Sequence, residues 1–416
     1  MKKYKLGEIC KLNRSSLKKT DSFDKILYLD TSSITENKIE LVQSFTLEEA
    51  PSRAQRKVEN NTIIFSTVRP NQKHFGILNN PEKNLIVSSG FTTIDVNNSK
   101  EIYPLYLYHK LTQPCIVDYL QTIAQNSVSS YPSINPDDIG NLSLTFPAFS
   151  DQQKIAAVLS SLDDKIALNN RINAKLEQMT KRLYDYWFVQ FDFPNADGKQ
   201  YKSTGGKMVW NEELKREIPE GWEVKKLGEI LILLKDGTHN PPKRQEKGIP
   251  LLTGTMFGNN FLDYDKATYI SEADYKIIHS QYEPHENDVI ITKIGTLGNV
   301  NLLRNIDIPL AIHCNSALLR FDMALGVYYP FSYCKSDLFK MRLKAIKGQS
   351  IQEFASLDRI SSIKSEVPCV DIINKFDKIV KPIIEKQKSI SFENKKLKEM
   401  RDKLLPLLMN GQVVVK

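Results

Sequence analysis

The strongest constraint on the fold is an internal duplication, because the 416-residue chain contains one long frame twice. The segment Leu6-Gly7-Glu8-Ile9 returns as Leu227-Gly228-Glu229-Ile230, and Leu176, Met179 and Leu183 return as Leu397, Met400 and Leu404, all at an offset of 221 residues. A repeat of this length is too long for a solenoid unit. Each copy is large enough to form a domain and a helix. We therefore expect two similar halves.

Composition is that of an ordinary globular protein, with 41% hydrophobic and 25% charged residues. The net charge of +8 is compatible with nucleic-acid binding without requiring it. No apolar run approaches the roughly 20 residues of a membrane span, and the N-terminus has no secretory signal. Five cysteines without CxxC spacing argue for reduced thiols and against a zinc site or a disulfide framework. We expect a cytoplasmic protein.

The pattern of turns and apolar residues divides the chain into five segments. Residues 1–147 read as short strands, brief helices and turns, and residues 223–368 repeat this pattern. Residues 148–190 and 369–416 each contain a long helix, and residues 191–222 form a linker whose aromatic residues predict docking on a helix end. The predicted class is α+β, with two pseudo-symmetric mixed α/β domains separated by two long antiparallel helices in an intramolecular coiled coil.

Apolar heptads indicate that the two long helices pair with each other, because such a stripe cannot stay exposed. At about 37 residues, each helix would be roughly 55 Å long. The predicted contacts between them are Ile155, Leu162, Leu176, Met179 and Leu183 in the first helix, and Phe376, Ile383, Leu397, Met400 and Leu404 in the second.

Polar residues and prolines interrupt both stripes. Lys165, Asn169, Lys386 and Glu393 fall at core positions, where they either mark a partly hydrated boundary or fix the register of the pair. Pro382 predicts a kink or a late start near Ile383 in the second helix, and Pro406 predicts its end.

Between the copies, strands and helix starts are kept while the stretches between them differ. Such differences arise by neutral drift in loops, but they are also what two readers of different sequences would show. Arginine and lysine read guanine, asparagine and glutamine read adenine, and hydroxyl groups hold phosphates. The candidate DNA-binding residues are Arg53, Arg56, Lys57, Arg69, Asn71, Gln72, Lys73 and His74 in the first copy, and Lys235, Thr238, His239, Asn240, Lys243, Arg244, Lys293, Thr296, Asn299, Gln349 and Ser350 in the second. A solvated loop explains any one of them, whereas clusters in equivalent places favour DNA.

Catalytic and metal signatures are missing from the sequence. His239-Asn240-Pro241-Pro242-Lys243 is similar to the Asn-Pro-Pro-aromatic loop of amino-methyltransferases, but Lys243 replaces the aromatic residue. Gly205-Gly206-Lys207-Met208 is no phosphate-binding loop, since Met208 replaces serine or threonine. The six histidines show no metal-ligand spacing. We expect a binding subunit without a catalytic residue or a metal.

The order of segments and motifs resembles the specificity subunits of type I restriction–modification systems across essentially the whole chain. The motifs are PSRAQRKV…STVRPNQ (Pro51–Gln72), QFDFP…STGGKMV…IPEGWE in the linker, DGTHNPP (Asp236–Pro242), GIPLLTG (Gly248–Gly254) and NDVIITKIGTLGN (Asn287–Asn299). The first long helix opens with Asp-Gln-Gln-Lys-Ile (Asp151–Ile155). The second departs from this pattern, because Ile372–Phe376 lacks the paired glutamines.

This resemblance implies a non-catalytic subunit that binds double-stranded DNA. Each module would be a target recognition domain for one half of a bipartite, asymmetric site, and the helices would set the spacer between the halves. The helices and linker would dock two methyltransferase subunits that carry S-adenosylmethionine, so this chain itself would hold no cofactor. Restriction/translocase subunits would join for cleavage. The alternatives are a duplicated coiled-coil adaptor that binds only proteins, and an enzyme, which would bind a cofactor as an isolated chain.

Overall fold

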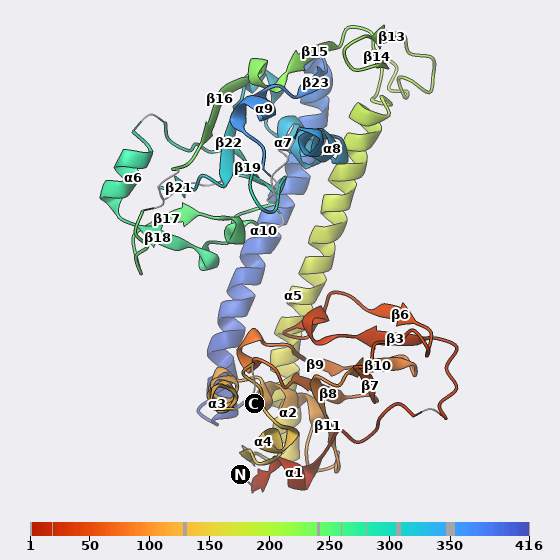
Figure 1. Cartoon of the computed structure of the whole chain (residues 1–416), viewed down its shortest axis with the longest axis vertical. Coiled ribbons are helices and arrows are strands. Elements are labelled where there is room, and N and C mark those ends of the chain that lie inside the picture. Colours follow the sequence, from red (N-terminus) through yellow and green to blue (C-terminus); the bar gives the residue numbers. More distant parts are fainter. Residues whose placement is uncertain are drawn as a thin grey trace. The chain divides into compact units, whose positions relative to one another are not determined.

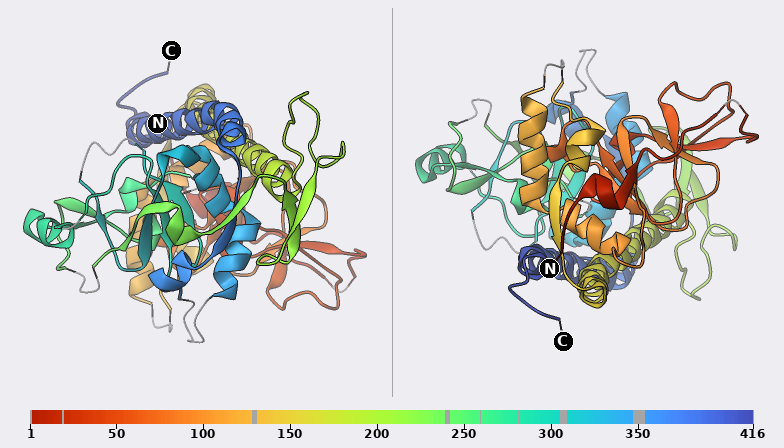
Figure 2. Two further views of the ribbon diagram at one scale, coloured as in Figure 1. Left: turned by 90° about the horizontal axis from the view of Figure 1, so that it is seen from above. Right: turned by 90° about the horizontal axis from the view of Figure 1, so that it is seen from below.

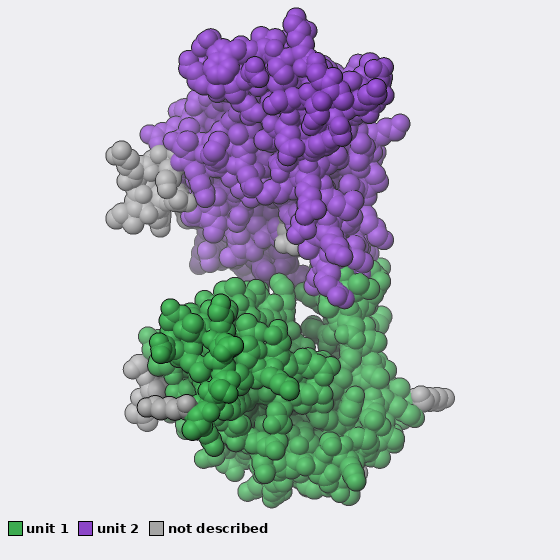
Figure 3. Space-filling model, turned by 90° about the vertical axis from the view of Figure 1, so that its right-hand side faces the viewer, with its two compact units in different colours: residues 1–168, 393–416 green, residues 169–392 purple. Residues whose placement is uncertain are grey.

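The computed structural model describes residues 2–18, 20–127, 131–238, 242–258, 260–280, 282–304, 309–346 and 354–415. The chain divides into two compact units, unit 1 with residues 1–168 and 393–416, and unit 2 with residues 169–392 (Figure 3). Each unit holds one globular module, which we call the first module (up to residue 147) and the second module (223–368). Two long helices, α5 (Phe149–Tyr184) and α10 (Val370–Met409), each contribute residues to both units (Figure 1).

The first module contains two four-stranded sheets, with strand orders β2-β11-β8-β9 and β6-β3-β10-β7. A third pair joins β1 to β12, and a small hairpin joins β4 to β5. The strands are β1 (Lys2–Lys5), β2 (Cys10–Leu12), β3 (Ile26–Leu29), β4 (Ile34–Thr35), β5 (Lys38–Ile39), β6 (Gln43–Phe45), β7 (Ala54–Lys57), β8 (Thr62–Ser66), β9 (Phe75–Leu78), β10 (Leu85–Ser88), β11 (Phe91–Val96) and β12 (Ser143–Phe146). The helices are α1 (Leu6–Ile9), α2 (Pro104–Leu111), α3 (Pro114–Gln125) and α4 (Pro136–Gly140).

The second module contains a four-stranded sheet of order β16-β22-β19-β20, a three-stranded sheet of order β18-β17-β21, and the pair β15-β23. The strands are β15 (Glu223–Lys226), β16 (Leu231–Asp236), β17 (Ile249–Leu252), β18 (Thr268–Ile270), β19 (Val289–Thr292), β20 (Val300–Leu302), β21 (Ala311–Ile312), β22 (Ser316–Phe321) and β23 (Lys364–Val367). The helices are α6 (Glu272–Ile278), α7 (Tyr328–Lys335), α8 (Asp337–Ala345) and α9 (Leu357–Ser361).

The two modules repeat one topology. Strands β16, β22, β19 and β20 occupy the places of β2, β11, β8 and β9 in their four-stranded sheets. In the second sheets, β17 pairs in parallel with β21 and antiparallel with β18, as β3 pairs with β10 and β6. The sequence duplication therefore corresponds to a duplication of strand order, to which the first module adds β7 and the β4–β5 hairpin and the second adds α6.

The central strands β8 and β19 are buried along their whole length because both of their faces are covered. Ile63 and Phe65 pack into one hydrophobic cluster and Ile64 into another. In the second module, Ile291 and Ile290 divide in the same way between two clusters. Strands covered on both faces read as continuous apolar runs, which is the pattern of Thr62-Ile63-Ile64-Phe65 in the sequence.

Within each unit, α5 and α10 contact each other and run in opposite directions. The contacting pairs are Asp163–Arg401 (3.0 Å) and Lys165–Glu393 (3.5 Å) in unit 1, and Asn173–Gln387 (3.2 Å) and Tyr184–Phe376 (6.2 Å between ring centres) in unit 2. In both units the residue number rises along α5 as it falls along α10. Lys165 and Glu393 are half exposed, so this ion pair lies at a hydrated edge and contributes little to stability.

The predicted heptad register is wrong at its second core position in both helices. Met179 and Met400 were expected in the contact and are instead 56% and 51% exposed. The buried positions lie one residue further along, at Leu159, Ile166 and Thr180 in α5 and at Val380, Gln387, Asn394 and Leu408 in α10. At the first core position Ile155 and Phe376 are buried, and the residues that are partly buried are Leu162, Leu176, Leu183, Ile383, Leu397 and Leu404.

The sequence predicted a kink or a late start of α10 at Pro382 and its end at Pro406, but the helix includes both prolines. The helix begins at Val370, passes Pro382 and continues beyond Pro406 to Met409. A proline removes one backbone hydrogen bond to the carbonyl four residues earlier. Both prolines are exposed, and so are Lys378 and Asp402, which carry the carbonyls that lose a partner. Because water can solvate these carbonyls, the helix tolerates both prolines.

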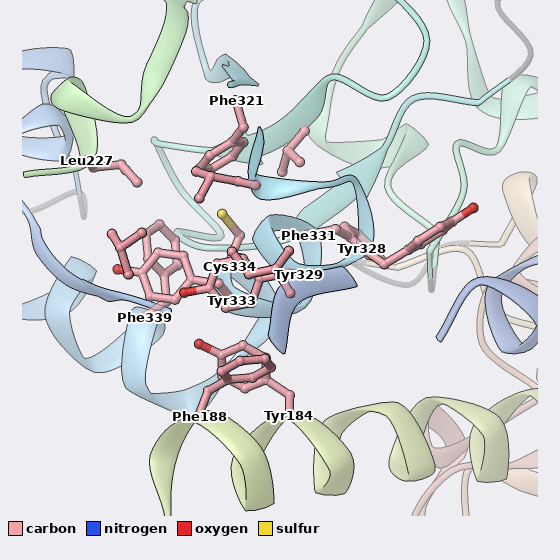
Figure 4. Packing of buried hydrophobic residues seen from close by; sticks show 14 of the residues in the cluster. Tyr184, Phe188, Leu227, Phe321, Tyr328, Tyr329, Phe331, Tyr333, Cys334 and Phe339 are labelled. Carbon is pink, nitrogen blue, oxygen red and sulfur yellow. The ribbon is translucent and has the colours of Figure 1, made fainter. Parts of the chain in front are cut away.

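The linker docks on unit 2, as its aromatic residues predicted. A π-helical segment, Asp185–Val189, follows α5, and the linker then forms a hairpin of β13 (Met208–Asn211) and β14 (Arg216–Pro219). Phe188, Phe191 and Trp222 are buried in the hydrophobic cluster of the second module. Figure 4 shows Tyr184 and Phe188 pointing from α5 and its extension toward Tyr329 and Tyr333 on α7.

Different side chains of the two long helices anchor the modules, Gln152 in the first turn of α5 and Asp377 at the eighth residue of α10. In unit 1, the Gln152 amide accepts a hydrogen bond from the Tyr103 N–H (2.9 Å) and donates to the carbonyls of Glu101 (2.9 Å) and Pro147 (3.1 Å). In unit 2, the Asp377 carboxylate accepts from three successive N–H groups at the start of α7, those of Val327, Tyr328 and Tyr329. A carboxylate at a helix N-terminus satisfies donors that have no partner within the helix.

A buried histidine in unit 1 predicts a loss of stability in acid. His109 on α2 is 4% exposed, and burial, together with the charge of Arg401, lowers its pKa to about 4. Between about pH 6.5 and pH 4 the unfolded chain therefore binds more protons at this residue than the folded one, so stability falls as the pH falls. We expect a loss of up to about 3 kcal/mol over this range. Hydrogen exchange of the α2 amides at pH 7 and pH 4 measures it. The His109→Gln variant should lack this part of the pH dependence, and an equal slope in both proteins would contradict the assignment.

Candidate nucleic-acid interface

In the first module, the loop between β8 and β9 is held rigidly through its backbone. Ser66 N–H donates to the His74 carbonyl (2.9 Å), Arg69 N–H to that of Pro132 (2.9 Å), and Asn71 N–H to the Gln121 side chain on α3 (3.2 Å). A short 3-10 helix, Pro70–Gln72, lies at the tip of the loop. The backbone of this loop is thus fixed from both sides. Among its side chains, that of Lys73 pairs with Glu36 (2.8 Å).

The side chains of this loop are those that suit DNA contacts. Arg69, Asn71, Gln72 and Lys73 are exposed, whereas His74 is partly buried with Nδ1 2.6 Å from the Ile34 carbonyl. Arg69 and Lys73 have positive φ angles of 47° and 57°, which are uncommon for residues with a side chain. Backbone strain of this kind is found where the surrounding structure imposes a conformation for function.

Tyr131 belongs to this surface although the sequence did not indicate it. It is 63% exposed, and the Arg69 guanidinium lies 5.6 Å from the centre of its ring. The two residues are 62 positions apart and meet because the chain around Val68 bridges to Ser133. The signal available in the sequence was an aromatic residue among turn-forming residues. An exposed aromatic ring beside an arginine is a suitable platform for stacking on nucleic-acid bases.

The basic residues near β7 are less available than the loop residues. Arg53 is exposed, but Arg56 donates to the Ser16 hydroxyl (3.2 Å) and Lys57 pairs with Asp21 (2.5 Å). The hydrogen bond from Lys57 lowers the pKa of Asp21. Arg56 and Lys57 therefore connect β7 with residues 16–21 within the module.

In the second module, the loop between β19 and β20 occupies the equivalent place. The Thr292 hydroxyl donates to the Thr296 carbonyl and accepts from the Asn299 N–H (2.9 Å). Gly295 and Gly298 have φ angles of 81° and 86°, which glycine adopts without strain. Thr296 and Asn299 are exposed. The loop is thus closed tightly around its own backbone and presents two polar side chains.

Lys293 does not reach the surface, and its prediction as a DNA contact is wrong. Its side chain is 2% exposed, and Nζ lies 2.8 Å from Asp236 Oδ2. The ammonium group also lies 5.4 Å from the centre of the Phe354 ring. A charge buried this deeply is paired within the protein and does not reach a phosphate or a base.

The remaining predicted residues of the second module surround the end of β16. Lys243 and Arg244 are exposed, while Lys235 and Thr238 are partly buried. Burial and the charge of Arg244 lower the pKa of His313, a residue that the sequence did not single out and that forms a parallel bridge with Thr238. Predictions for His239, Asn240, Gln349 and Ser350 lie outside the described residues.

The described residues provide neither a membrane-spanning helix nor a cluster of metal ligands. Over these residues, no helix is long and apolar enough to cross a membrane. In the same part of the chain, no group of three or more histidine, cysteine, aspartate or glutamate residues is arranged to bind a metal ion.

Comparison with known proteins agrees with the duplicated fold and its polar loops. Residues 1–178 match the family model described as the type I restriction modification DNA specificity domain. The HindI specificity subunit of Haemophilus influenzae is 24% identical over 465 residues, which cover 99% of this chain and 99% of that protein. The MjaIX specificity subunit of Methanocaldococcus jannaschii is 27% identical, with 88% of this chain and 81% of that protein covered.

A solved structure shares the fold. The S subunit of a type I restriction–modification system from M. genitalium matches with a TM-score of 0.54 at 19% identity, covering 98% of this chain and 95% of that one. Like that structure, this chain has an α+β fold, and exposed polar and basic loops extend from its two modules. Over nearly its whole length the chain is similar to the specificity subunits of type I restriction–modification systems, and residues 1–178 match the model of their DNA specificity domain. These relatives are named as the specificity subunits of type I restriction enzymes, and the matching domain is described as their DNA specificity domain.

Proposed function

We propose that this chain reads a bipartite, asymmetric DNA site, with one module on each half-site. The observation that supports this most directly is the repeated strand order of the two modules. The loops that follow β8 and β19 leave equivalent strands, but the first presents Arg69, Asn71 and Gln72 and the second presents Thr296 and Asn299. Equivalent platforms with different base-reading side chains suit two half-sites of different sequence.

We further propose that α5 and α10 form an antiparallel coiled coil that separates the modules and sets the spacer length. The duplex backbone has local two-fold symmetry, so equivalent modules bind it best when a pseudo-two-fold axis relates them. The opposite directions of the helices within each unit support such an axis. With 36 and 40 residues, the helices are roughly 55–60 Å long, comparable with the ~34 Å between half-sites one turn apart.

In this proposal the helices and the linker dock two methyltransferase subunits, which bring S-adenosylmethionine, and restriction/translocase subunits join them in the cytoplasm. Apolar side chains outside the helix contact support a protein-binding role. Met179, Met400 and Phe392 are 56%, 51% and 61% exposed on the long helices, and Trp210 of the linker hairpin is 55% exposed. In this proposal the partner subunits cover these exposed side chains.

Exchange of one module is expected to change one half of the recognised motif. Residues 1–147 would be replaced by the corresponding module of a relative with a different site, and the chimera expressed with its methyltransferase. Because each module reads its own half-site, long-read detection of methylated adenines should show one altered half, an unaltered other half and an unaltered spacer. A change in both halves, or in neither, would exclude independent readers. A chain that acts only as a protein adaptor would give no motif at all.

A single substitution refines the same test. Arg69→Ala should weaken specific binding by about 10- to 100-fold, the range for loss of an arginine that reads a base. Lys83→Ala is the matched control, because this exposed lysine lies between β9 and β10, at the far end of β9 from Arg69. Equal affinity of the Arg69→Ala protein and the wild type would remove Arg69 from the interface.

A further inference from the structure

Lys293 lies where several segments leave the main sheet of the second module. It follows β19 directly, and its ammonium group pairs with Asp236 at the end of β16 (2.8 Å) and faces the Phe354 ring (5.4 Å). Its N–H donates to the Asn315 carbonyl (2.8 Å), and its own carbonyl accepts from the Ala355 N–H (3.1 Å). One residue thus connects its own loop to three other segments of the chain.

The end of β16 is pressed against one of these segments. A Cβ atom on Gly237 would lie 1.6 Å from the Ile312 carbonyl oxygen, so only glycine allows this approach. Thr238 N–H donates to the same carbonyl (3.2 Å), and the Tyr282 hydroxyl donates to the Asp236 carbonyl (2.7 Å). The partner of Lys293 is therefore itself fixed by packing and by hydrogen bonds.

The segments that meet at this pair carry the exposed polar groups of the proposed interface. Thr296 and Asn299 belong to the loop that begins at Lys293, and Arg244 lies close enough to His313 to lower its pKa. The loop is joined to the pair directly through Lys293, and Arg244 lies beside His313, which bridges to Thr238 two residues after Asp236. The pair lies beneath the surface, since the Lys293 side chain is only 2% exposed.

Stability alone does not explain a buried ion pair at this place. The desolvation of two charges offsets much of their attraction, and apolar side chains of similar size are often equally stable or more so. An ion pair differs from an apolar contact by its direction and its fixed distance, which specify one arrangement of the groups that it joins. Fixed geometry is what base recognition requires, because base-reading hydrogen bonds tolerate little displacement.

We propose that the Lys293–Asp236 pair is a positioning element that sets the arrangement of the DNA-reading segments of the second module. This inference rests on the proposed function, because it assigns the pair to the half-site that this module reads. Lys293 and Asp236 touch neither bases nor phosphates in this scheme. They act through Thr296, Asn299 and Arg244.

The test uses Lys293→Met in the full chain, purified with its methyltransferase subunit, and selection from a library of random-sequence duplexes. We expect base preference to fall at least tenfold in one half of the motif, with the other half and the spacer unchanged. Binding to an unrelated duplex and its salt dependence should equal those of the wild type, because no phosphate contact is lost. A folded variant with wild-type preferences in both halves would overturn the proposal.

Lys335→Met is the matched control, because Lys335 is also a largely buried lysine of unit 2, paired with Glu177 at 2.5 Å, but it joins α7 to α5. It should lower the thermal midpoint and leave the motif intact. If it relaxes the same half-site to the same extent, the effect is one of stability and the proposal fails. Should Lys293→Met not fold, Asp236→Asn replaces it, since it keeps the side-chain shape and removes the charge. If the wild-type chain selects no motif, the proposed function fails, and this inference with it.

Discussion

Replacing Glu366 with alanine is expected to lower the free energy of unfolding of unit 2 by about 3–5 kcal/mol. The Glu366 side chain on β23 is 5% exposed. Its carboxylate accepts hydrogen bonds from both terminal nitrogens of Arg342 (2.8 and 2.9 Å) and from one of Arg216 (3.4 Å). Arg216 also donates to the Val189 carbonyl (3.0 Å) and lies 4.6 Å from the Phe191 ring. Without the carboxylate, two largely buried guanidinium groups lose their counter-charge.

The electrostatics of this group agree with that expectation. Burial lowers the pKa of Arg342, but the hydrogen bonds and charge of Glu366 outweigh it and raise that pKa above its usual value. The same carboxylate joins the linker hairpin, through Arg216, to the second module, so the linker should loosen as well. This part of the expectation is visible as faster hydrogen exchange in β13 and β14.

Tryptophan fluorescence during urea unfolding measures the effect, because all three tryptophans, Trp187, Trp210 and Trp222, lie in unit 2. Glu220→Ala is the control, since Glu220 also pairs with a cation, Lys207, but with 52% and 71% of the two side chains exposed. Its cost should stay below about 1 kcal/mol. Equal losses of unfolding free energy in the two variants would show that the Glu366 network stabilises the protein no more than an exposed ion pair does.

The second large effect is expected for Phe376→Ala, which should cost about 3–5 kcal/mol. The Phe376 ring on α10 is fully buried, with its centre 4.9 Å from that of Phe188 and 5.8 Å from that of Trp187. Removing it leaves a cavity among aromatic rings that hold α10 against the end of α5. Such rings are rigid and cannot collapse into the space without a change of rotamer.

Phe392→Ala is the matched control for this prediction. It removes the same side chain from the same helix at a position that is 61% exposed, so its cost should remain within about 0.5 kcal/mol. Urea unfolding followed by fluorescence at pH 7 gives both values. A cost for Phe376→Ala below about 1 kcal/mol would mean that the aromatic cluster reorganises, which the close ring contacts argue against.

The duplicated frame could be predicted from sequence because apolar strands leave a clear pattern. Apolar runs in the sequence at Lys25–Thr31, Thr62–Thr67 and Asn84–Ser88 indicate strands, and they correspond to β3, β8 and β10 within one or two residues at each end. Turn residues separate these runs, and both ends of each run are therefore marked. The burial of Phe191 and Trp222 in the linker was also readable, since exposed aromatic residues in such density would be costly.

The helix register could not be read correctly because polar residues occupy the buried side of the contact. Gln387 is 2% exposed and is held there by Asn260 (2.9 Å), which comes from a loop of the second module. Arg401 likewise fills a core position by pairing with Asp163. A pattern of apolar residues alone therefore selected Met179 and Met400, whose side chains are apolar but face outward.

The sequence indicated which loops are exposed, but it did not indicate which of their side chains reach the surface. Loop composition located the exposed Arg69 and Asn299, but nothing local distinguishes Lys293 from them, because its partner Asp236 lies 57 positions earlier. Tyr131 was missed for the same reason, since only the folded chain brings it beside Arg69. Tertiary partners decide whether a charged residue in a loop meets water or another part of the protein.

Figure 2 marks the two ends of the chain, and both belong to unit 1. The two long helices contribute residues to each unit. The two anchoring side chains of the long helices, Gln152 and Asp377, bond to main-chain atoms of their modules. An attachment through main-chain atoms does not depend on the side chains of the attached module. Recombination can therefore deliver a domain of unrelated composition to either scaffold helix without redesigning the attachment, provided that the incoming backbone follows the same path.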